Sequence, residues 1–254
     1  MKMNHFQSPD GLQLAWYELG GGDGEPPIVL QHGFSSATLH EWVECKIVDD
    51  LATLGRRIIA IDARGHGNSE KPHDSSRYGG NFMAQDLMAL ITLLGIESYD
   101  LVGYSMGGTI VSMVASLDPR VRRVAIGGVG HGLVNRGGLD PKVLNTKALS
   151  AGLRAPSEEG LSGIVLEFRR AAISRNNDLL ALAAHSEAAG PRDIDFGAIT
   201  AEAIVLAGDV DPLAEHPEVL AGAIKGAQLA IVPGDHHASK RSPEFRKALV
   251  DFLR

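Results

Sequence analysis

The chain has 254 residues, 44% of them hydrophobic, and a formal net charge of −7. This length allows one substantial hydrophobic core, so we expect a single core domain with room for an insertion. The acidic balance and the lack of a long Lys/Arg cluster provide no basis for binding to nucleic acid or to an anionic membrane surface.

Cysteine usage and the first residues of the chain predict a cytoplasmic protein. Cys45 is the only cysteine in the sequence, which excludes an internal disulfide and a Cys-rich zinc site. Residues 1–10 hold no apolar secretory segment, and the charge-free stretch 101–117 is better explained as a buried strand and helix than as a membrane span. No metal-type histidine spacing and no nucleotide-binding glycine motif occurs, so we expect no metal and no cofactor. The expected partner is a small-molecule substrate, and nothing here indicates an oligomeric state.

Strand and helix patterns alternate along most of the chain. A turn sequence at 8–11 separates two short strands within 3–19, and a Gly- and Pro-rich loop follows at 20–27. The elements expected next are a strand at 28–31, a helix at 39–54, a strand at 57–61, a helix at 80–94, a strand at 99–104, a helix to about 116 and a strand at 121–126. Such alternation predicts a parallel sheet covered by helices on both faces.

This alternation breaks between residues 131 and 196. Two helical patterns occupy the stretch, one that opens at 156–159 and continues to about 172, and one at 177–189. Alternation then resumes with a strand at 203–207, a helix at 217–225, a strand at 228–232 and a helix at 243–253. We therefore expect a core domain made of residues 1–130 and 197–254, with 131–196 inserted as a small helical lid.

The stretch 101–110 carries the first candidate for chemistry. It reads as an apolar strand, a Gly-x-Ser-x-Gly turn and the start of an apolar helix, which is the context of a nucleophile elbow. Gly103 and Gly107 leave room for the strand and the helix to approach, and the Met106 N–H lies at the helix N-terminus, where it faces developing negative charge. Ser105 is the candidate nucleophile; the alternative is a glycine-rich turn that happens to hold a serine.

Acyl transfer through a serine also needs a base and a carboxylate that orients the base. Asp209 and Asp211 follow the strand that ends at 207, and His236 and His237 follow the strand that ends at 232. Because ligands of open α/β sheets bind at the carboxyl ends of the strands, these loops are expected to meet near Ser105. Position alone leaves both aspartates and both histidines as candidates.

The sequence resembles the α/β-hydrolase fold family over nearly its whole length. The matching motifs are His32-Gly33-Phe34, Asp62-x-Arg64-Gly65-His66-Gly67-x-Ser69, Gly103-x-Ser105-x-Gly107-Gly108, Gly208-x-x-Asp211 and a late histidine. The resemblance implies a mostly parallel eight-stranded sheet with helices on both faces and a helical lid. It also implies a Ser105 nucleophile, an Asp211 acid, a His236 base, and an oxyanion hole from the backbone N–H groups of Phe34 and Met106.

Several neighbouring residues have other interpretations. Asp209 is expected to be a turn residue, and Asp235, which stands where the family usually has glycine, is expected to cap its loop rather than to pair with the histidine. His237 competes with His236 for the role of base. His131 and His185, both in the predicted lid, could face the pocket.

These features predict a carboxylesterase-like serine hydrolase that cleaves a small, fairly apolar ester or related acyl compound through an acyl-enzyme and without a cofactor. Two alternatives remain. The same three residues could hydrolyse a carbon–carbon bond or act as a perhydrolase, or the chain could be a ligand receptor that keeps the pocket without turnover.

Overall fold

A single sheet organises the protein, and its strands carry the loops described below. The computed structural model describes residues 1–138 and 141–254, in which eight strands pair in the order β1-β2-β4-β3-β5-β6-β7-β8. The pairs β1–β2 and β2–β4 are antiparallel and the others are parallel. The strands are β1 (Lys2–Gln7), β2 (Gln13–Gly21), β3 (Gly24–Gln31), β4 (Arg56–Ile61), β5 (Tyr99–Tyr104), β6 (Val121–Gly127), β7 (Glu202–Gly208) and β8 (Gln228–Val232). The predicted mostly parallel, eight-stranded sheet is confirmed.

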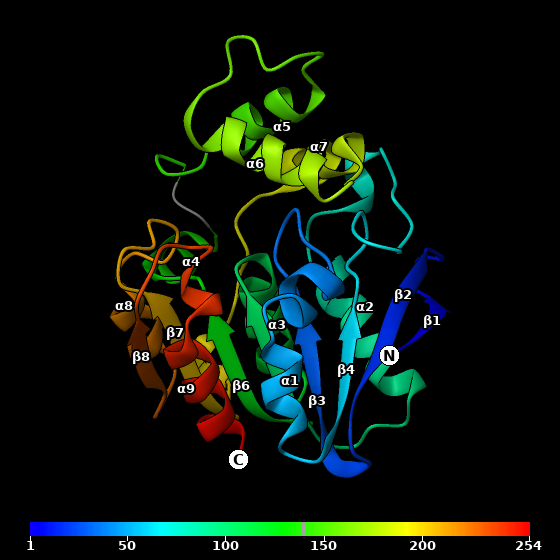
Figure 1. The fold of residues 1–254 in the computed structure, drawn as a ribbon, viewed down its shortest axis with the longest axis vertical. Helices are drawn as coiled ribbons and strands as arrows, with labels where there is room; N and C mark the ends of the chain where they lie inside the picture. The colour runs from blue at the N-terminus through cyan, green and yellow to red at the C-terminus, as the bar shows by residue number, and fades with distance from the viewer. Residues whose placement is uncertain (139–140) are drawn as a thin grey trace.

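The central strands are apolar along their whole length because both of their faces are buried. Val29 of β3 packs into the hydrophobic cluster on one face, and its neighbours Ile28 and Leu30 pack into the cluster on the other. Helices α2 (Phe82–Leu93), α3 (Met106–Leu117) and α8 (Pro217–Ala223) cover the first face, and α1 (Ile47–Ala52) and α9 (Pro243–Leu253) cover the second (Figure 1). The result is the three-layered core that the alternating pattern predicts.

Four further helices follow β6, and three of them form a separate layer. They are α4 (His131–Arg136), α5 (Thr146–Arg154), α6 (Gly163–Ser174) and α7 (Leu179–Ala188). Figure 1 shows α5, α6 and α7 above the carboxyl ends of the strands, where they enclose their own small hydrophobic cluster. Helix α4 instead packs beside α8 in the core layer. Residues 139 and 140 of the predicted lid lie outside the described residues.

The cap, as we call α5–α7 and their connections, is fastened to the core by few polar contacts. Arg175 Nη1 and Asn177 Nδ2 both donate to the carbonyl of Ser35, each at 3.1 Å. His73 Nε2 lies 3.0 Å from the Asp178 carboxylate at the start of α7. These contacts tie the cap to two loops of the core, the one that follows β3 and the one that follows β4.

The predicted helix at 39–54 is wrong, because the chain bends in its middle. A π-helical turn at Leu39–Val43 ends before Lys46, which has a left-handed φ of 60°, and α1 begins at Ile47. On one straight helix Trp42 and Ile47, five residues apart, would point about 140° away from each other at about 100° per residue. Both are fully buried in the same cluster, and the bend allows this.

Two other local predictions also need correction. The loop expected at 20–27 is shorter, because β2 continues to Gly21 and β3 begins at Gly24. In the cap, α6 begins at Gly163 and not at 156–159, where Glu158 and Glu159 instead take part in turns. Helices α4 and α5 were not predicted. No helix within residues 1–138 and 141–254 has both the length and the apolar character needed to cross a bilayer.

Candidate active site

Ser105 lies at a sharp turn between β5 and α3. Its backbone has φ 57° and ψ −118°, a conformation that a non-glycine residue adopts only where its surroundings hold it. A Cβ on Gly103 would lie 2.3 Å from the carbonyl oxygen of Gly107, and a Cβ on Gly107 would lie 2.0 Å from that of Gln31. Only glycine fits at either position, so the turn is as tight as the sequence predicts.

His236 lies between Ser105 and Asp211. Its Nε2 is 2.9 Å from Ser105 Oγ and its Nδ1 is 2.8 Å from Asp211 Oδ2. His236 and Asp211 are both buried, and the Asp211 carboxylate also accepts a hydrogen bond from the Leu213 N–H at 2.9 Å. The structure thus brings together the three side chains that sequence reasoning selected, from positions 25 and 131 residues away from His236.

The three competing residues point elsewhere. Asp209 Oδ1 accepts a hydrogen bond from the Gly234 N–H at 2.8 Å and so joins two loops. Asp235 Oδ1 accepts from the N–H groups of His237 and Ala238, at 2.9 Å and 2.8 Å, which caps the short turn that follows His236. His237 is exposed and makes no described contact with Asp211 or Ser105.

The loop that carries Phe34 lies against the Ser105 turn. A Cβ on Gly33 would lie 3.1 Å from the Tyr104 carbonyl and 3.3 Å from Ser105 Cβ, so the two loops are in close contact. The Met106 N–H is the first of α3. Among the described residues, neither this N–H nor that of Phe34 has a hydrogen-bond acceptor.

His32 holds this loop in place through both ring nitrogens. Its Nε2 accepts from the Ala63 N–H at 3.0 Å, so its Nδ1 must carry the proton and donates to the Gly33 carbonyl at 2.8 Å. A histidine with both nitrogens satisfied in this way has a structural role. His66 is also buried; its Nδ1 lies 3.0 Å from the carbonyl of Arg64, and its Nε2 has no partner in the part of the chain that the structure describes.

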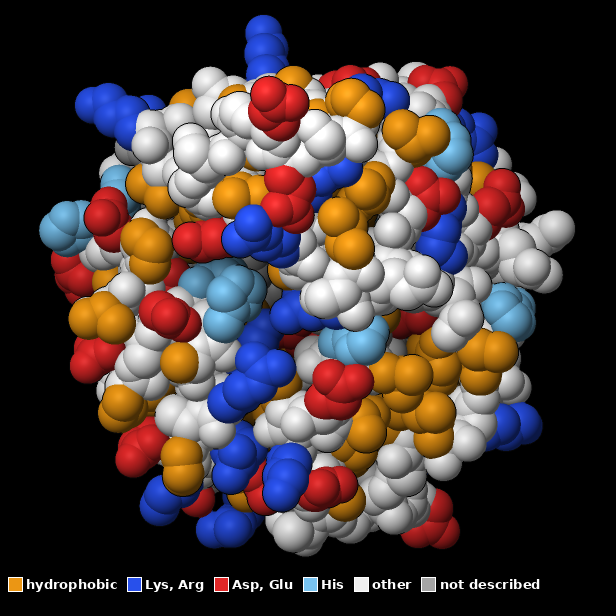
Figure 2. All heavy atoms as spheres, turned by 45° about the horizontal axis from the view of Figure 1, so that its top comes forward, with side chains coloured by type: hydrophobic (Ala, Val, Ile, Leu, Met, Phe, Trp, Pro, Cys, Tyr) orange, Lys and Arg blue, Asp and Glu red, His pale blue; other side chains and the backbone are white. Residues whose placement is uncertain are grey.

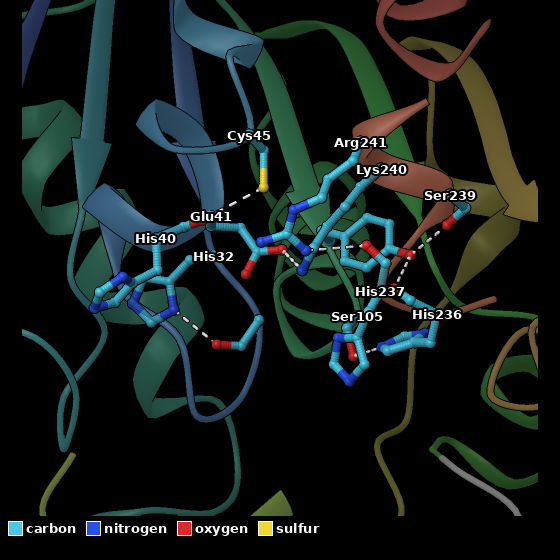
Figure 3. Close-up of polar contacts among 12 residues, drawn as sticks. His32, His40, Glu41, Cys45, Ser105, His236, His237, Ser239, Lys240 and Arg241 are labelled. Atoms are coloured by element: carbon cyan, nitrogen blue, oxygen red, sulfur yellow. Dashed lines mark hydrogen bonds and ion pairs between the residues drawn. The ribbon is translucent and has the colours of Figure 1, made fainter. Parts of the chain in front are cut away.

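A buried ion pair lies beside the loops that carry Ser105 and His236 (Figure 3). Lys240 of the turn after His236 reaches Glu41 of the π-helical turn, and its Nζ lies 4.7 Å from the centre of the Tyr104 ring. Burial alone would raise the pKa of the Glu41 carboxyl, but the adjacent Lys240 ammonium lowers it to about 2. The Tyr104 hydroxyl donates to the His236 carbonyl at 2.7 Å. Sequence reasoning did not identify this network, because its members are far apart and match no motif.

A cavity of about 740 Å³ extends from Ser105 between the core and the cap. This volume lies in the range of sites for small organic molecules. Its walls are mostly apolar and include Phe34, Met83, Ile110, Met113, Leu144 and Phe168. His185 lines the cavity, whereas His131 lines a much smaller one beside α8 and lies 2.9 Å from the Glu215 carbonyl.

His185 is buried among aromatic rings. Its ring stacks on Tyr78 at a centroid distance of 5.4 Å, and the Phe34 ring meets it edge-on at 5.3 Å. Burial, with the charge of nearby Arg192 adding to it, lowers the pKa of His185 to about 3. The imidazole is therefore neutral at physiological pH, and its buried Nδ1 has no partner among the described residues. In the same residues no group of three or more His, Cys, Asp or Glu side chains could hold a metal ion.

Comparison with known proteins shows the family of this chain. A sequence model of the alpha/beta hydrolase fold matches residues 26–154, half of the chain. The chain belongs to the α/β-hydrolase fold family. Among solved structures, the enol-lactonase from Burkholderia xenovorans LB400 superposes on this α/β-hydrolase with a TM-score of 0.79, covering 98% of this chain and 99% of that one at 25% sequence identity.

Related sequences match a part of this α/β-hydrolase. It is 35% identical over 127 residues to the dihydrolipoyllysine-residue acetyltransferase component of the acetoin cleaving system of Pseudomonas putida, which is 48% of this chain and 32% of that protein. It is 32% identical over 117 residues to the bifunctional epoxide hydrolase 2 of Rattus norvegicus, which is 45% of this chain and 20% of that protein. The chain thus spans a third or less of the length of these two relatives.

Proposed function

We propose that this protein is a serine hydrolase that cleaves a carboxylic ester or a related acyl compound without a cofactor. The observation that carries the proposal is the continuous line of contacts from Ser105 Oγ through the His236 ring to the Asp211 carboxylate, at 2.9 Å and 2.8 Å. These are the distances at which a base can take a hydroxyl proton and a carboxylate can orient that base.

In the proposed mechanism Ser105 Oγ attacks the substrate carbonyl while His236 Nε2 takes its proton. Asp211 holds the Nδ1–H tautomer and stabilises the imidazolium that forms. The N–H groups of Phe34 and Met106 then donate to the oxyanion of the tetrahedral intermediate, and the leaving alcohol receives the proton from His236. Water activated by His236 hydrolyses the acyl-enzyme and returns Ser105 to its starting state.

The cavity supports a small substrate with a substantial apolar part. Its walls are mostly apolar, and we propose that residues 131–196 form the lid that encloses it, with α5–α7 over the site and α4 packed on the core. Enclosure of this kind removes water from the reacting atoms and strengthens the electrostatic interactions that stabilise the oxyanion.

Turnover and active-site labelling test the proposal together. We expect p-nitrophenyl acetate, butyrate and octanoate to be hydrolysed and a fluorophosphonate probe to label Ser105. Ser105→Ala should lose labelling and at least about 10⁴-fold in kcat, with an unchanged circular dichroism spectrum. If Ser105→Ala kept more than a few per cent of the activity, the nucleophile would be wrong. Labelling of Ser105 without ester turnover would instead favour carbon–carbon bond hydrolysis, perhydrolysis or a receptor.

A further inference from the structure

The charged residues that line the large cavity are all basic. Arg136, Lys147 and Arg192 line it, and no Asp or Glu does so within residues 1–138 and 141–254. This is unexpected in a chain where Asp and Glu outnumber Lys and Arg by 31 to 24. A wall with cations and without acids produces a positive potential, which favours a negatively charged ligand.

Arg192 is the central residue of this basic wall. It follows the end of α7, and its N–H donates to the Gly137 carbonyl at 2.9 Å. Gly137 has a left-handed φ of 64°, and a Cβ there would lie 2.1 Å from the Arg192 carbonyl oxygen, so the two backbones are in direct contact. This contact holds Arg192 against the end of α4.

The Arg192 guanidinium is half-buried and has no carboxylate partner in the described part of the chain. Its Nη1 donates to the carbonyl of Gly190, which also lines the cavity. Burial lowers the pKa of Arg192, yet a guanidinium stays protonated at physiological pH. A partly desolvated cation paired with a single carbonyl retains four of its five N–H donors for a ligand.

The other two basic residues contribute differently. Lys147, the second residue of α5, lines the cavity, is exposed and lacks an ion-pair partner among the described residues, so it adds a solvated positive charge to the wall. Arg136 is engaged in an interaction of its own, so Arg192 and Lys147 are the two residues proposed to contact a ligand. Figure 2 shows, on the face that it presents, a hollow with Lys and Arg side chains below it and both acidic and basic side chains above it.

We propose that the basic wall binds a carboxylate of the substrate, and that the substrate is therefore an acyl compound with a carboxylate at the end remote from the scissile bond. This inference rests on the proposed hydrolase function. The planar guanidinium of Arg192 matches a carboxylate in a two-bonded arrangement, with Lys147 as an additional charge. The apolar side chains of Met83, Ile110 and Met113 then contact the chain between the two ends.

Binding of unreactive analogues tests the proposal without relying on turnover. Succinanilic, glutaranilic and adipanilic acids differ from butyranilide, valeranilide and hexananilide only by a carboxylate in place of a terminal methyl group. 4-Butyramidobenzoate places the charge on the other side of the amide. We expect at least one charged analogue to bind about 10- to 100-fold more tightly than its uncharged counterpart in calorimetry at pH 7.

Variants at Arg192 and Lys147 test whether the basic wall causes the preference for charged over uncharged analogues. Arg192→Gln should abolish most of the preference, Arg192→Lys should retain part of it because the charge remains, and Lys147→Gln should reduce it only about threefold because Lys147 is exposed. The matched control is Arg170→Gln, which removes the same charge from an exposed ion pair with Glu158 on the outside of the cap. It should leave the preference unchanged.

Each remaining outcome separates the two proposals. If no charged analogue binds more tightly, or if a folded Arg192→Gln or Arg192→Lys protein binds as the wild type does, the carboxylate subsite is wrong. Mono-p-nitrophenyl glutarate and p-nitrophenyl valerate then report on the hydrolase itself. Hydrolysis of both esters at equal rates would support the proposed hydrolase function and contradict the carboxylate subsite. Tight binding of glutaranilic acid without Ser105-dependent turnover of either ester would support the carboxylate subsite and contradict the proposed hydrolase function.

Discussion

The core and the cap supply the two sides of one cavity by different physical means. On the core side Ser105, Asp211 and His236 each follow a strand of the same sheet, and buried hydrogen bonds connect all three. On the cap side a small hydrophobic cluster supports three helices, and apolar side chains such as Ile173 and Leu180 remain exposed at 50% and 43%.

This difference indicates which side of the cavity tolerates substitutions without a change in the structure of the other side. A sheet whose strands are buried on both faces fixes the positions of the loops at the strand ends. The distances between the atoms that exchange a proton are therefore well defined. The cap has fewer such constraints, so Arg192 and Lys147 can be replaced at small cost to the fold. Variants on both sides measure how complete this division is.

The largest effect is expected for the base. His236→Ala should lower kcat by on the order of 10⁶-fold, because His236 is the residue that contacts both Ser105 and Asp211. His237→Ala removes an adjacent but exposed imidazole and should keep nearly full activity. Kinetics on p-nitrophenyl butyrate compare the two, and an inactive His237→Ala beside an active His236→Ala would reassign the base.

The acid is the next test of the core side. Asp211→Asn should lower kcat by about 10⁴-fold, because an amide cannot stabilise the imidazolium and selects the wrong tautomer. Asp209→Asn alters only a contact with the Gly234 N–H and should be mild. The same ester assay ranks the two variants, and the reverse order would identify Asp209 as the acid.

Variants of the buried Glu41–Lys240 ion pair test whether the stability of the core side depends on this contact. Lys240→Met leaves the Glu41 charge without its partner and should lower the free energy of unfolding at pH 7 by about 3–5 kcal/mol. A Glu41→Leu/Lys240→Met double variant should recover most of this loss, because no unpaired charge remains. Urea unfolding measures both, and an unchanged midpoint for Lys240→Met would show that the pair is not a structural constraint.

The same pair predicts a pH dependence with a definite sign. The pKa of Glu41 is about 2 in the folded protein and near 4.5 when unfolded, so its stabilising contribution is present above pH 4.5 and is lost as the pH falls toward 2. In Lys240→Met no ammonium lies beside Glu41, so burial raises the pKa of this carboxyl. When the carboxyl takes a proton, the unpaired buried charge is removed and the variant regains stability. The stability difference between the two proteins should therefore begin to narrow above pH 4.5, as the variant takes up its proton, and narrow further as the pH falls toward 2 and the wild type loses its ion pair.

The smallest effect is expected on the cap side. The pKa of His185 is about 3 in the folded protein, so the unfolded chain takes up a proton below pH 6.5 that the folded protein does not. Stability is therefore lost as the pH falls from 6.5 toward 3, by about 1 kcal/mol at pH 5.5. His185→Phe keeps an aromatic ring against Tyr78 and should remove this part of the loss. Equal changes between pH 7 and pH 5.5 in both proteins would contradict it.

Sequence patterns located the sheet because two physical rules act locally. Buried strands must be apolar throughout, and tight turns between strand and helix require glycine, so β5, Gly103 and Gly107 were visible without a structure. Asp211 and His236 could be selected because their loops follow strands of the same sheet.

The features that were missed depend on contacts between distant residues. Glu41 and Lys240 are 199 positions apart, and neither carries a local signal that it is buried. Helix α4 has only six residues, which leaves little apolar periodicity to detect. Helix α5 is different, because Leu149 and Leu153 are buried at helical spacing and this signal was present in the sequence. Arg192 follows Gly190-Pro191, a sequence typical of an exposed loop, so its place in the cavity wall appears only in the folded chain.

Tyr104 lies next to Ser105 in the chain, and its hydroxyl holds the carbonyl of His236 at 2.7 Å. This hydrogen bond joins the strand that carries Ser105 to the loop that carries His236, so a shift of either backbone relative to the other has to stretch it. The distance over which the proton moves is therefore constrained by the backbone as well as by the three side chains.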